Sequence, residues 1–129
     1  MNTPNNLKYT KTHEWVKIEN DTAIEGITDF AQSELSDIAF VEFPEKGRKI
    51  AQGDVIGTIE AVKAVSDLVA AVSGEIIEVN EALKSSPDKI NTSAFEEGWI
   101  VKIKISNPDD VKKLMNADEY AKHCETSHH

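Results

Sequence analysis

The sequence predicts a mostly β domain with a sandwich or barrel-like core, short helices and a C-terminal helix. Turns that contain glycine, asparagine or acidic residues divide the chain into short segments. Several of these segments are rich in branched and aromatic residues, which favour strands. In segment 98–105, apolar residues alternate with Lys102 and Lys104, the period of a half-buried strand. A chain of 129 residues fits one domain with one core.

The N-terminal part predicts two strands, a helix and a third strand. Residues 8–17 and 22–27 carry apolar residues on both sides of an asparagine–aspartate turn. Thr28 can cap a short helix, because the aspartate that follows it is favourable in a first turn. The strand predicted over 38–43 must end before Pro44, which has no amide hydrogen for a β-ladder.

The centre of the chain contains two similar segments, 53–56 and 74–77. Each opens with glycine and an acid and continues with two branched apolar residues, which predicts a turn that leads into a strand. If 55–60 and 66–72 are strands, Lys63 lies at or near the tip of the hairpin between them. Its ammonium must face water, because burying an unpaired charge is costly. On this pattern alone, an ordinary solvated lysine is the commoner outcome.

The C-terminal third predicts less regular structure. Residues 80–90 form a helical or turn segment that Pro87 interrupts. After the strand over 98–105, a last helix is predicted to break or reorient near Asn116, and the tail from Glu125 is predicted to be disordered.

Composition limits the classes of partner. The formal net charge is -9 and Arg48 is the only arginine, so nucleic acid and anionic membranes should repel the chain. No apolar run reaches the length of a membrane span, and no secretory or transit pattern is present, so we expect a cytoplasmic protein. The single cysteine, Cys124, excludes an intramolecular disulfide and fits a reducing compartment. We interpret it as an incidental thiol in a polar tail.

No pattern of catalytic or metal-binding residues emerges. The histidines are His13, His123, His128 and His129. His13 and the glutamate after it lack the second histidine of a zinc-protease helix, so we expect no metal site. Gly53 and Gly57 do not form a phosphate-binding loop. The sequence therefore does not predict an enzyme.

Segments 60–67 and 72–80 resemble the lipoylation segment of the glycine cleavage H-protein family. Further segments match the family in order and spacing: Tyr9-Thr10, His13-Glu14-Trp15, 26–32, 41–44, 80–83, Pro87, Asn91 and Gly98-Trp99. This number of matches in the same order and spacing makes the resemblance specific to this family. The resemblance implies a barrel-sandwich hybrid of the lipoyl/biotinyl type. It further implies one lipoyl-carrier domain over 1–129, with an ordered core of about 7–122 and flexible ends.

The resemblance also implies a function. Lys63 would carry lipoate through an amide bond, and the chain would be a carrier protein of glycine catabolism and one-carbon metabolism without an active site. The implied partners are glycine decarboxylase, which loads an aminomethyl group, a tetrahydrofolate-dependent aminomethyltransferase, dihydrolipoamide dehydrogenase and a lipoyl-attaching enzyme. The family folds its arm into a cleft, whose matching positions here are Thr12, Glu14 and Asp67, and Glu60 is kept beside the lysine. We expect Glu14 and Asp67 to hold the cationic end of the loaded arm.

Three positions depart from the family pattern. Ala61, Ser36 and Ala71 stand where the family usually has serine, glycine and proline. The change at Ala61 could weaken recognition by the lipoyl-attaching enzyme, although the acceptor amine remains.

Three alternatives stay open. The chain could be a lipoyl or biotinyl domain of another complex, such as a 2-oxoacid dehydrogenase. Biotin sites usually have methionines beside the lysine and acyltransferase lipoyl domains an aspartate before it, whereas here Val62 and Ala64 flank Lys63. It could instead be a lipoyl relay that serves other proteins, or a binding module whose lysine is unmodified.

Overall fold

The computed structural model describes residues 3–127. The strands are β1 (Lys8–Tyr9), β2 (Glu14–Glu19), β3 (Thr22–Ile27), β4 (Ile38–Glu42), β5 (Lys49–Ile50), β6 (Val55–Ala61), β7 (Val65–Val69), β8 (Gly74–Val79) and β9 (Val101–Ile105). The helices are α1 (Asp29–Leu35), α2 (Ala82–Ser85), α3 (Lys89–Thr92), the 3₁₀ helix η1 (Pro108–Lys113) and α4 (Ala117–Ser127). This confirms a mostly β fold with short helices and a C-terminal helix.

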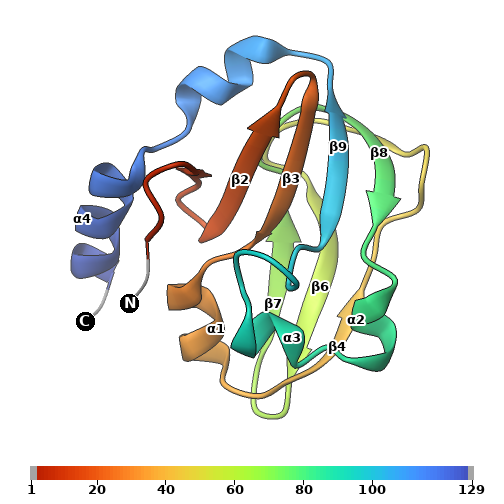
Figure 1. Cartoon of the computed structure of the whole chain (residues 1–129), viewed down its shortest axis with the longest axis vertical. Helices are drawn as coiled ribbons and strands as arrows, with labels where there is room; N and C mark the ends of the chain where they lie inside the picture. The colour runs from red at the N-terminus through yellow and green to blue at the C-terminus, as the bar shows by residue number, and fades with distance from the viewer. Residues whose placement is uncertain (1–2, 128–129) are drawn as a thin grey trace.

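The strands form two antiparallel sheets that enclose the core. One sheet has six strands in the order β1-β2-β3-β9-β8-β5, and the other has the order β4-β6-β7. Figure 1 shows β6 and β7 behind β3 and β9. The predicted alternation places Val101 and Ile103 in the core, where neither is exposed, while Lys104 faces water. Burying each of these side chains contributes about 1.5–3 kcal/mol.

The strand predicted over 8–17 is in fact two strands. β1 ends at Tyr9 and β2 begins at Glu14, and the two pair antiparallel. The turn between them contains His13 with a φ of 71°, a left-handed conformation that strand residues do not adopt. The turn brings Thr10 back to Glu14, because the Thr10 N–H donates to the Glu14 carbonyl at 3.0 Å.

Helix α1 begins as predicted, since the Thr28 hydroxyl accepts the N–H of Ala31 at 3.2 Å. It ends at Ser36, and Asn91 of α3 holds that end. The Asn91 side chain donates to the Ser36 carbonyl at 2.7 Å and accepts the Ile38 N–H at 2.9 Å. These bonds fix the start of β4 against two helices.

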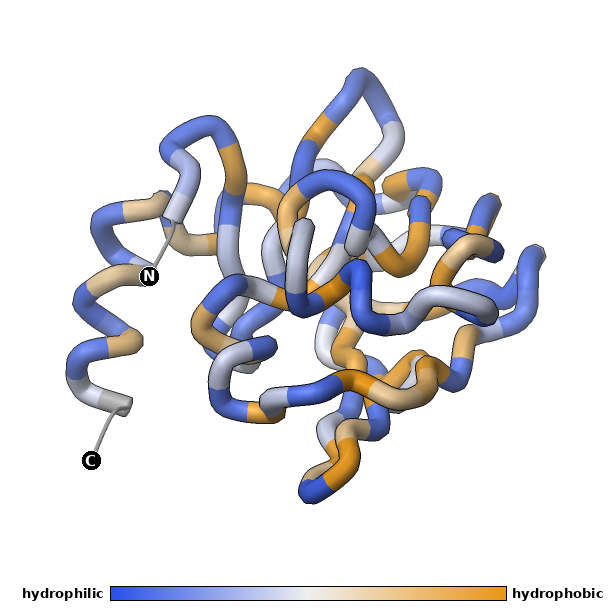
Figure 2. Tube along the Cα trace, turned by 60° about the horizontal axis from the view of Figure 1, so that its bottom comes forward, coloured by the Kyte–Doolittle hydropathy of each residue, from blue (hydrophilic) through white to orange (hydrophobic). Residues whose placement is uncertain are grey.

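The C-terminal region reorients at Asn116, as predicted. The Asn116 side chain accepts the N–H of Glu119 at 2.9 Å and so caps α4. The prediction of disorder from Glu125 is wrong as far as Ser127, because α4 continues to that residue. Hydrophilic and weakly hydrophobic stretches alternate along α4 (Figure 2), as expected when one side of a helix is buried. His128 and His129 lie outside the described residues.

Cys124 is a core residue and not an incidental thiol of a polar tail. It is 3% exposed and belongs to a second apolar cluster with Tyr9, Trp15 and Tyr120. The rings of Tyr9 and Tyr120 stack with their centroids 4.6 Å apart. The cluster attaches α4 to the N-terminal strands.

Candidate functional site

Lys63 lies at the tip of the β6–β7 hairpin, where the sequence predicts it. The Ala61 N–H donates to the Ala64 carbonyl at 2.8 Å, which closes a four-residue turn with Val62 and Lys63 at its centre. Lys63 is exposed. In Figure 1 the hairpin connection extends below the rest of the molecule. The turn therefore presents one amine to solvent.

The hairpin tip is held from the side. Its Val62 N–H donates to the Asp37 carbonyl at 3.0 Å, and Ala61 pairs with Ile38 of β4. The Asn91 side chain fixes the residues on both sides of Asp37, at Ser36 and Ile38. Lys63 consequently stands on a supported turn and not on a free loop.

The surface around Lys63 is apolar and acidic. Val62 is 73% exposed and Val65 is 64% exposed. Glu60, which is partly buried, pairs with Val65 on one side and with Phe40 on the other, so these three side chains share one face of the small sheet. Exposed apolar side chains that gather on one face are typical of a surface that a partner protein covers.

Glu14 is the centre of a second polar site. Its side chain is fully buried, and its Oε1 accepts the hydroxyls of Thr10 and Thr12, each at 2.5 Å. Its Oε2 accepts the N–H of Val69, at the end of β7, at 3.2 Å. Burial raises the pKa of Glu14 to about 7, although the hydrogen bonds from the threonines and Val69 oppose the rise. The carboxyl can therefore gain or lose its proton near neutral pH.

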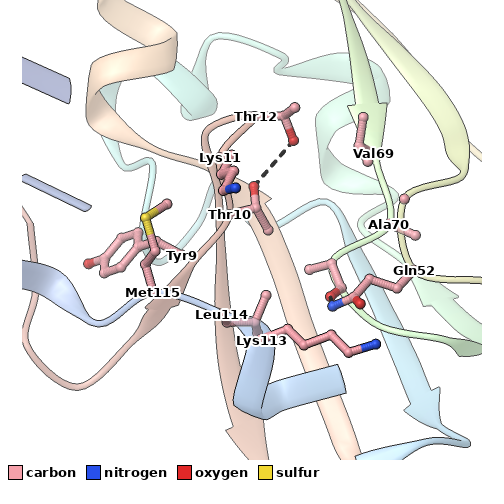
Figure 3. Close-up of a pocket in the computed structure, with 12 residues that line it drawn as sticks. Tyr9, Thr10, Lys11, Thr12, Gln52, Val69, Ala70, Lys113, Leu114 and Met115 are labelled. Atoms are coloured by element: carbon pink, nitrogen blue, oxygen red, sulfur yellow. Dashed lines mark hydrogen bonds between the residues drawn. The ribbon is translucent and has the colours of Figure 1, made fainter. Parts of the chain in front are cut away.

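A cavity of about 420 Å³ is lined by Thr10, Thr12 and Val69, which donate hydrogen bonds to this carboxyl, while the buried Glu14 is not one of its lining residues. Figure 3 shows that its walls come from four parts of the chain: the N-terminal turn, the β5–β6 connection with Gln52, the end of β7 with the segment after it, and the end of η1 with the segment after it. The lining residues are Tyr9, Thr10, Lys11, Thr12, Gln52, Gly53, Val69, Ala70, Ala71, Lys113, Leu114 and Met115. Tyr9 and Met115 close one side with two backbone hydrogen bonds of 2.9 and 2.8 Å.

The structure brings together Thr12 and Glu14, two of the residues predicted for the cleft. Asp67 is exposed on β7, and none of the hydrogen bonds or ion pairs within residues 3–127 joins it to Glu14. It does lie on the same side of the strand as Val69, because residues two apart share a face. Asp67 therefore stands along the path between the hairpin tip and the cavity.

Sequence reasoning missed Glu25. This glutamate is fully buried in β3, and its Oε1 accepts the Ala71 N–H at 3.0 Å. The signal was present, because Ala23, Glu25 and Ile27 occupy alternate positions of one strand and all three are buried. An acidic side chain at an inward position of a strand indicates a hydrogen-bond partner inside the protein, because burying an unpaired carboxyl group is costly.

The described part of the chain contains no group of three or more histidine, cysteine, aspartate or glutamate residues arranged to hold a metal ion. None of the helices between residues 3 and 127 has the length and apolar character that crossing a bilayer requires.

Known proteins of one family are similar to this chain along nearly its whole length. The sequence model of the family described as Glycine cleavage H-protein matches residues 7–127. The glycine cleavage system H protein of Staphylococcus epidermidis is 50% identical over 121 residues, which are 94% of this chain and 96% of the relative. That of Halothermothrix orenii is 47% identical over 125 residues, with 97% and 98% covered.

The fold is also similar to a solved one. The crystal structure of a glycine cleavage system H protein from Mycobacterium marinum has a TM-score of 0.86 and 36% sequence identity, and the match covers 92% of this chain and 96% of that chain. The sandwich of two sheets, the supported hairpin and these matches together show that this chain belongs to the glycine cleavage H-protein family.

Proposed function

We propose that this chain is the lipoyl carrier of a glycine cleavage system and that lipoate is attached to Lys63 through an amide bond. The observation that carries the proposal is the exposed amine of Lys63 on a turn supported by β4, in a chain of this family. Bound lipoate supplies the sulfur chemistry that carries the aminomethyl group of glycine, whereas the protein supplies position and protection.

The proposed partners are glycine decarboxylase, the tetrahydrofolate-dependent aminomethyltransferase, dihydrolipoamide dehydrogenase and the lipoyl-attaching enzyme. The chain would act as a carrier without an active site of its own, in a bacterial-type cytoplasm. Tethering raises the local concentration of the cargo at each partner. The exposed Val62 and Val65 offer apolar surface that the attaching enzyme can cover while it reaches the amine.

The cavity beside Glu14 is the proposed resting place of the arm. Its apolar walls suit a hydrocarbon chain, and Glu14 can supply one negative charge for a cationic cargo amine. Thr10 and Thr12 hold that carboxylate in place through their hydroxyls. Asp67, on the same side of β7 as Val69, provides a second negative charge along the way from Lys63.

Mass spectrometry tests the attachment site. The protein is co-expressed with a lipoyl-attaching enzyme in medium with lipoate, and its intact mass and proteolytic peptides are measured. We expect one lipoyl adduct, on Lys63, which the Lys63→Arg variant lacks. The matched control is Lys46→Arg, which changes another exposed lysine and should keep the adduct. An unmodified Lys63, or an adduct elsewhere, would refute the proposal.

Two further measurements test the pathway and the cleft. Glycine-dependent exchange of bicarbonate by the decarboxylase requires the lipoylated protein if it serves glycine cleavage, but not if it only relays lipoyl groups. For the cleft, the lifetime of the amine-loaded arm is compared between wild type and Glu14→Ala. We expect a shorter lifetime for Glu14→Ala and no change for Glu42→Gln, which removes an exposed charge. An equal lifetime for Glu14→Ala would remove the cleft from the proposal.

A further inference from the structure

The free edge of β7 carries an unusual set of hydrogen bonds. β7 is an outer strand of the small sheet, and the chain continues from it through Ala70 and Ala71. The Ala70 N–H donates to the Asp54 carbonyl at 2.8 Å. The N–H groups of Val69 and Ala71, two residues apart, donate instead to side-chain carboxyls, of Glu14 at 3.2 Å and Glu25 at 3.0 Å. Two carboxyl groups thus occupy the place of a neighbouring strand.

Glu14 and Glu25 lie close together inside the larger sheet. Glu25 pairs with Val16, and Glu14 is two residues before Val16 on the same face of β2. Diagonal neighbours of this kind have their Cβ atoms about 7 Å apart. The N–H groups that the two carboxyls accept, on Val69 and Ala71, are also about 7 Å apart along an extended chain. The carboxyl groups therefore form an adjacent pair behind the cavity wall.

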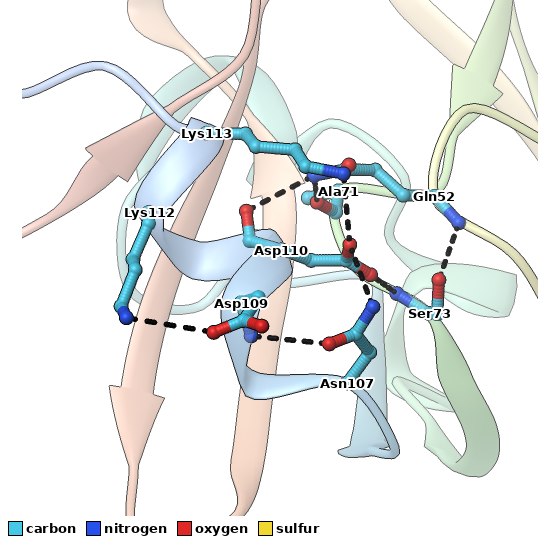
Figure 4. A network of polar contacts seen from close by, with 8 residues as sticks. All are labelled: Gln52, Ala71, Ser73, Asn107, Asp109, Asp110, Lys112 and Lys113. Carbon is cyan, nitrogen blue, oxygen red and sulfur yellow. Dashed lines mark hydrogen bonds and ion pairs between the residues drawn. The ribbon is translucent and has the colours of Figure 1, made fainter.

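The surroundings of Glu25 contain no compensating cation among the described residues. Glu14 is the charged residue that faces it from β2, and β9 contributes the buried Val101. Asp110 of η1 lies beyond the 71–73 segment and is already engaged by the Ser73 N–H at 2.8 Å and by Lys113 (Figure 4). An ionised Glu25 would consequently be an unpaired buried charge.

Several observations indicate that Glu25 holds its proton. Its Oε2 is buried and has no hydrogen-bond partner in the described structure, which is costly for a carboxylate. Burial raises the pKa of Glu25 well above its ordinary value, and the nearby charge of Glu14 raises it further. Two such carboxyls titrate as a pair, and the first to ionise is Glu14, which has the better hydrogen bonds.

We propose that Glu25 is a positioning residue of the arm cleft: it anchors the Ala71 end of the cavity wall as a neutral acid while Glu14 alone changes charge. Of this buried pair, only Glu14 would then carry a negative charge toward a cationic cargo. A neutral side chain holds the same part of the wall, because the Gln52 amide donates to the Ala71 carbonyl at 2.9 Å (Figure 4). The inference rests on the proposed arm cleft, and its tests separate the two.

The first test uses the unmodified protein, so that it is independent of lipoylation. The side-chain carboxyl carbons of Glu14 and Glu25 are followed by NMR from pH 5 to pH 10. We expect Glu14 to titrate near neutrality while Glu25 stays protonated through that transition and ionises only in the alkaline range. We also expect Glu25→Gln to leave the midpoint of Glu14 unchanged. Ionisation of Glu25 before Glu14, or a large shift of Glu14 in Glu25→Gln, would overturn the proposal.

The second test measures the anchor itself by amide hydrogen exchange. Glu25→Leu leaves the buried Ala71 N–H without an acceptor, and Ala71→Pro removes the donor. Each single variant should speed exchange at Val69 about tenfold or more, the equivalent of one lost buried hydrogen bond. The double variant Glu25→Leu/Ala71→Pro removes both partners of the hydrogen bond. The factor by which it speeds exchange at Val69 should therefore be smaller than the product of the factors measured for the two single variants. Unchanged exchange at Val69 in both single variants would refute the anchor.

The third readout is the lifetime of the amine-loaded arm as a function of pH. Wild type should lose protection in the alkaline range where Glu25 ionises, whereas Glu25→Gln should keep it there. Superimposable profiles of wild type and Glu25→Gln would overturn the positioning role. If Glu14→Ala has no effect on the lifetime either, the arm cleft itself has failed, and the titration of the unmodified protein still decides whether Glu25 acts on Glu14.

Discussion

The buried Glu14 carboxyl should make the protein lose stability as pH rises through neutrality. Its pKa is 4.5 in its ordinary state and about 7 in the fold. The folded chain therefore binds more protons than the unfolded chain between these values, and the free energy of unfolding falls with rising pH. At about 1.4 kcal/mol for each pH unit, the loss between pH 4.5 and pH 7 amounts to about 3 kcal/mol.

Urea unfolding followed by tryptophan fluorescence measures this loss, because Trp15 is buried in the fold. Wild type and Glu14→Gln are compared at pH 5, 6, 7 and 8 at constant ionic strength. Glu14→Gln should be less stable at pH 5 by about 1–2 kcal/mol, since its amide cannot accept the Val69 N–H while it accepts both threonine hydroxyls. The deficit should shrink as pH rises, because glutamine has no ionisation cost.

The control is Glu42→Gln, which removes the same charge from the surface and should run parallel to wild type. Glu25 adds a further decline that begins near its ordinary pKa of 4.5 and continues above pH 7, because the pKa of that carboxyl in the fold lies well above its ordinary value. Parallel curves for wild type and Glu14→Gln between pH 5 and pH 7 would show that Glu14 does not titrate in the folded state, and the reasoning would be wrong.

Three substitutions test the supports of the site. Ser36 has φ 62° and ψ −140°, a conformation that favours glycine, so Ser36→Gly should raise the free energy of unfolding by about 1 kcal/mol in a urea titration, and Ser36→Ala should not. Asn91→Ala leaves the Ile38 N–H without its acceptor and should lower the free energy of unfolding by about 2 kcal/mol. If this variant also slows lipoylation of Lys63 in a time course followed by mass spectrometry, Asn91 supports the hairpin tip as well. A Cβ on Gly74 would lie 2.0 Å from the Lys104 carbonyl oxygen, so Gly74→Ala should separate β8 from β9 and lower thermal stability by about 3 kcal/mol, and an unchanged melting temperature would contradict this close approach.

Much of the fold could be predicted from sequence because local rules dominate there. Thr28 caps α1, Pro44 lies beyond the end of β4, and the segments around Lys63 form a hairpin as their pattern indicates. In contrast, the break between β1 and β2 depends on His13 in a left-handed conformation, which no propensity of histidine predicts strongly. The helix through residue 125 depends on the stacking of Tyr120 on Tyr9, a contact between the two ends of the chain.

The candidate site likewise has one part that local sequence predicts and one part that it does not. The place of Lys63 could be predicted, because it depends only on the two strands next to it in the sequence. The cleft is harder, since its Glu14 carboxyl meets Val69 from 55 residues further along the chain. The alternation of Ala23, Glu25 and Ile27 indicates that Glu25 points inward, but its hydrogen-bond partner, the Ala71 N–H, lies 46 residues further along the chain and follows from no local pattern.

The pairing of Tyr9 with Met115 makes the cavity depend on both ends of the chain, whereas the Lys63 hairpin depends on neither. A small opening that separates these two residues would therefore uncover the cavity and leave the attachment turn folded. The cavity and the Lys63 turn thus belong to parts of the molecule with different local stability. If lipoate is attached to Lys63 as proposed, a movement of the Tyr9 and Met115 segments alone would expose the arm to a partner enzyme, while the Lys63 turn stays in place.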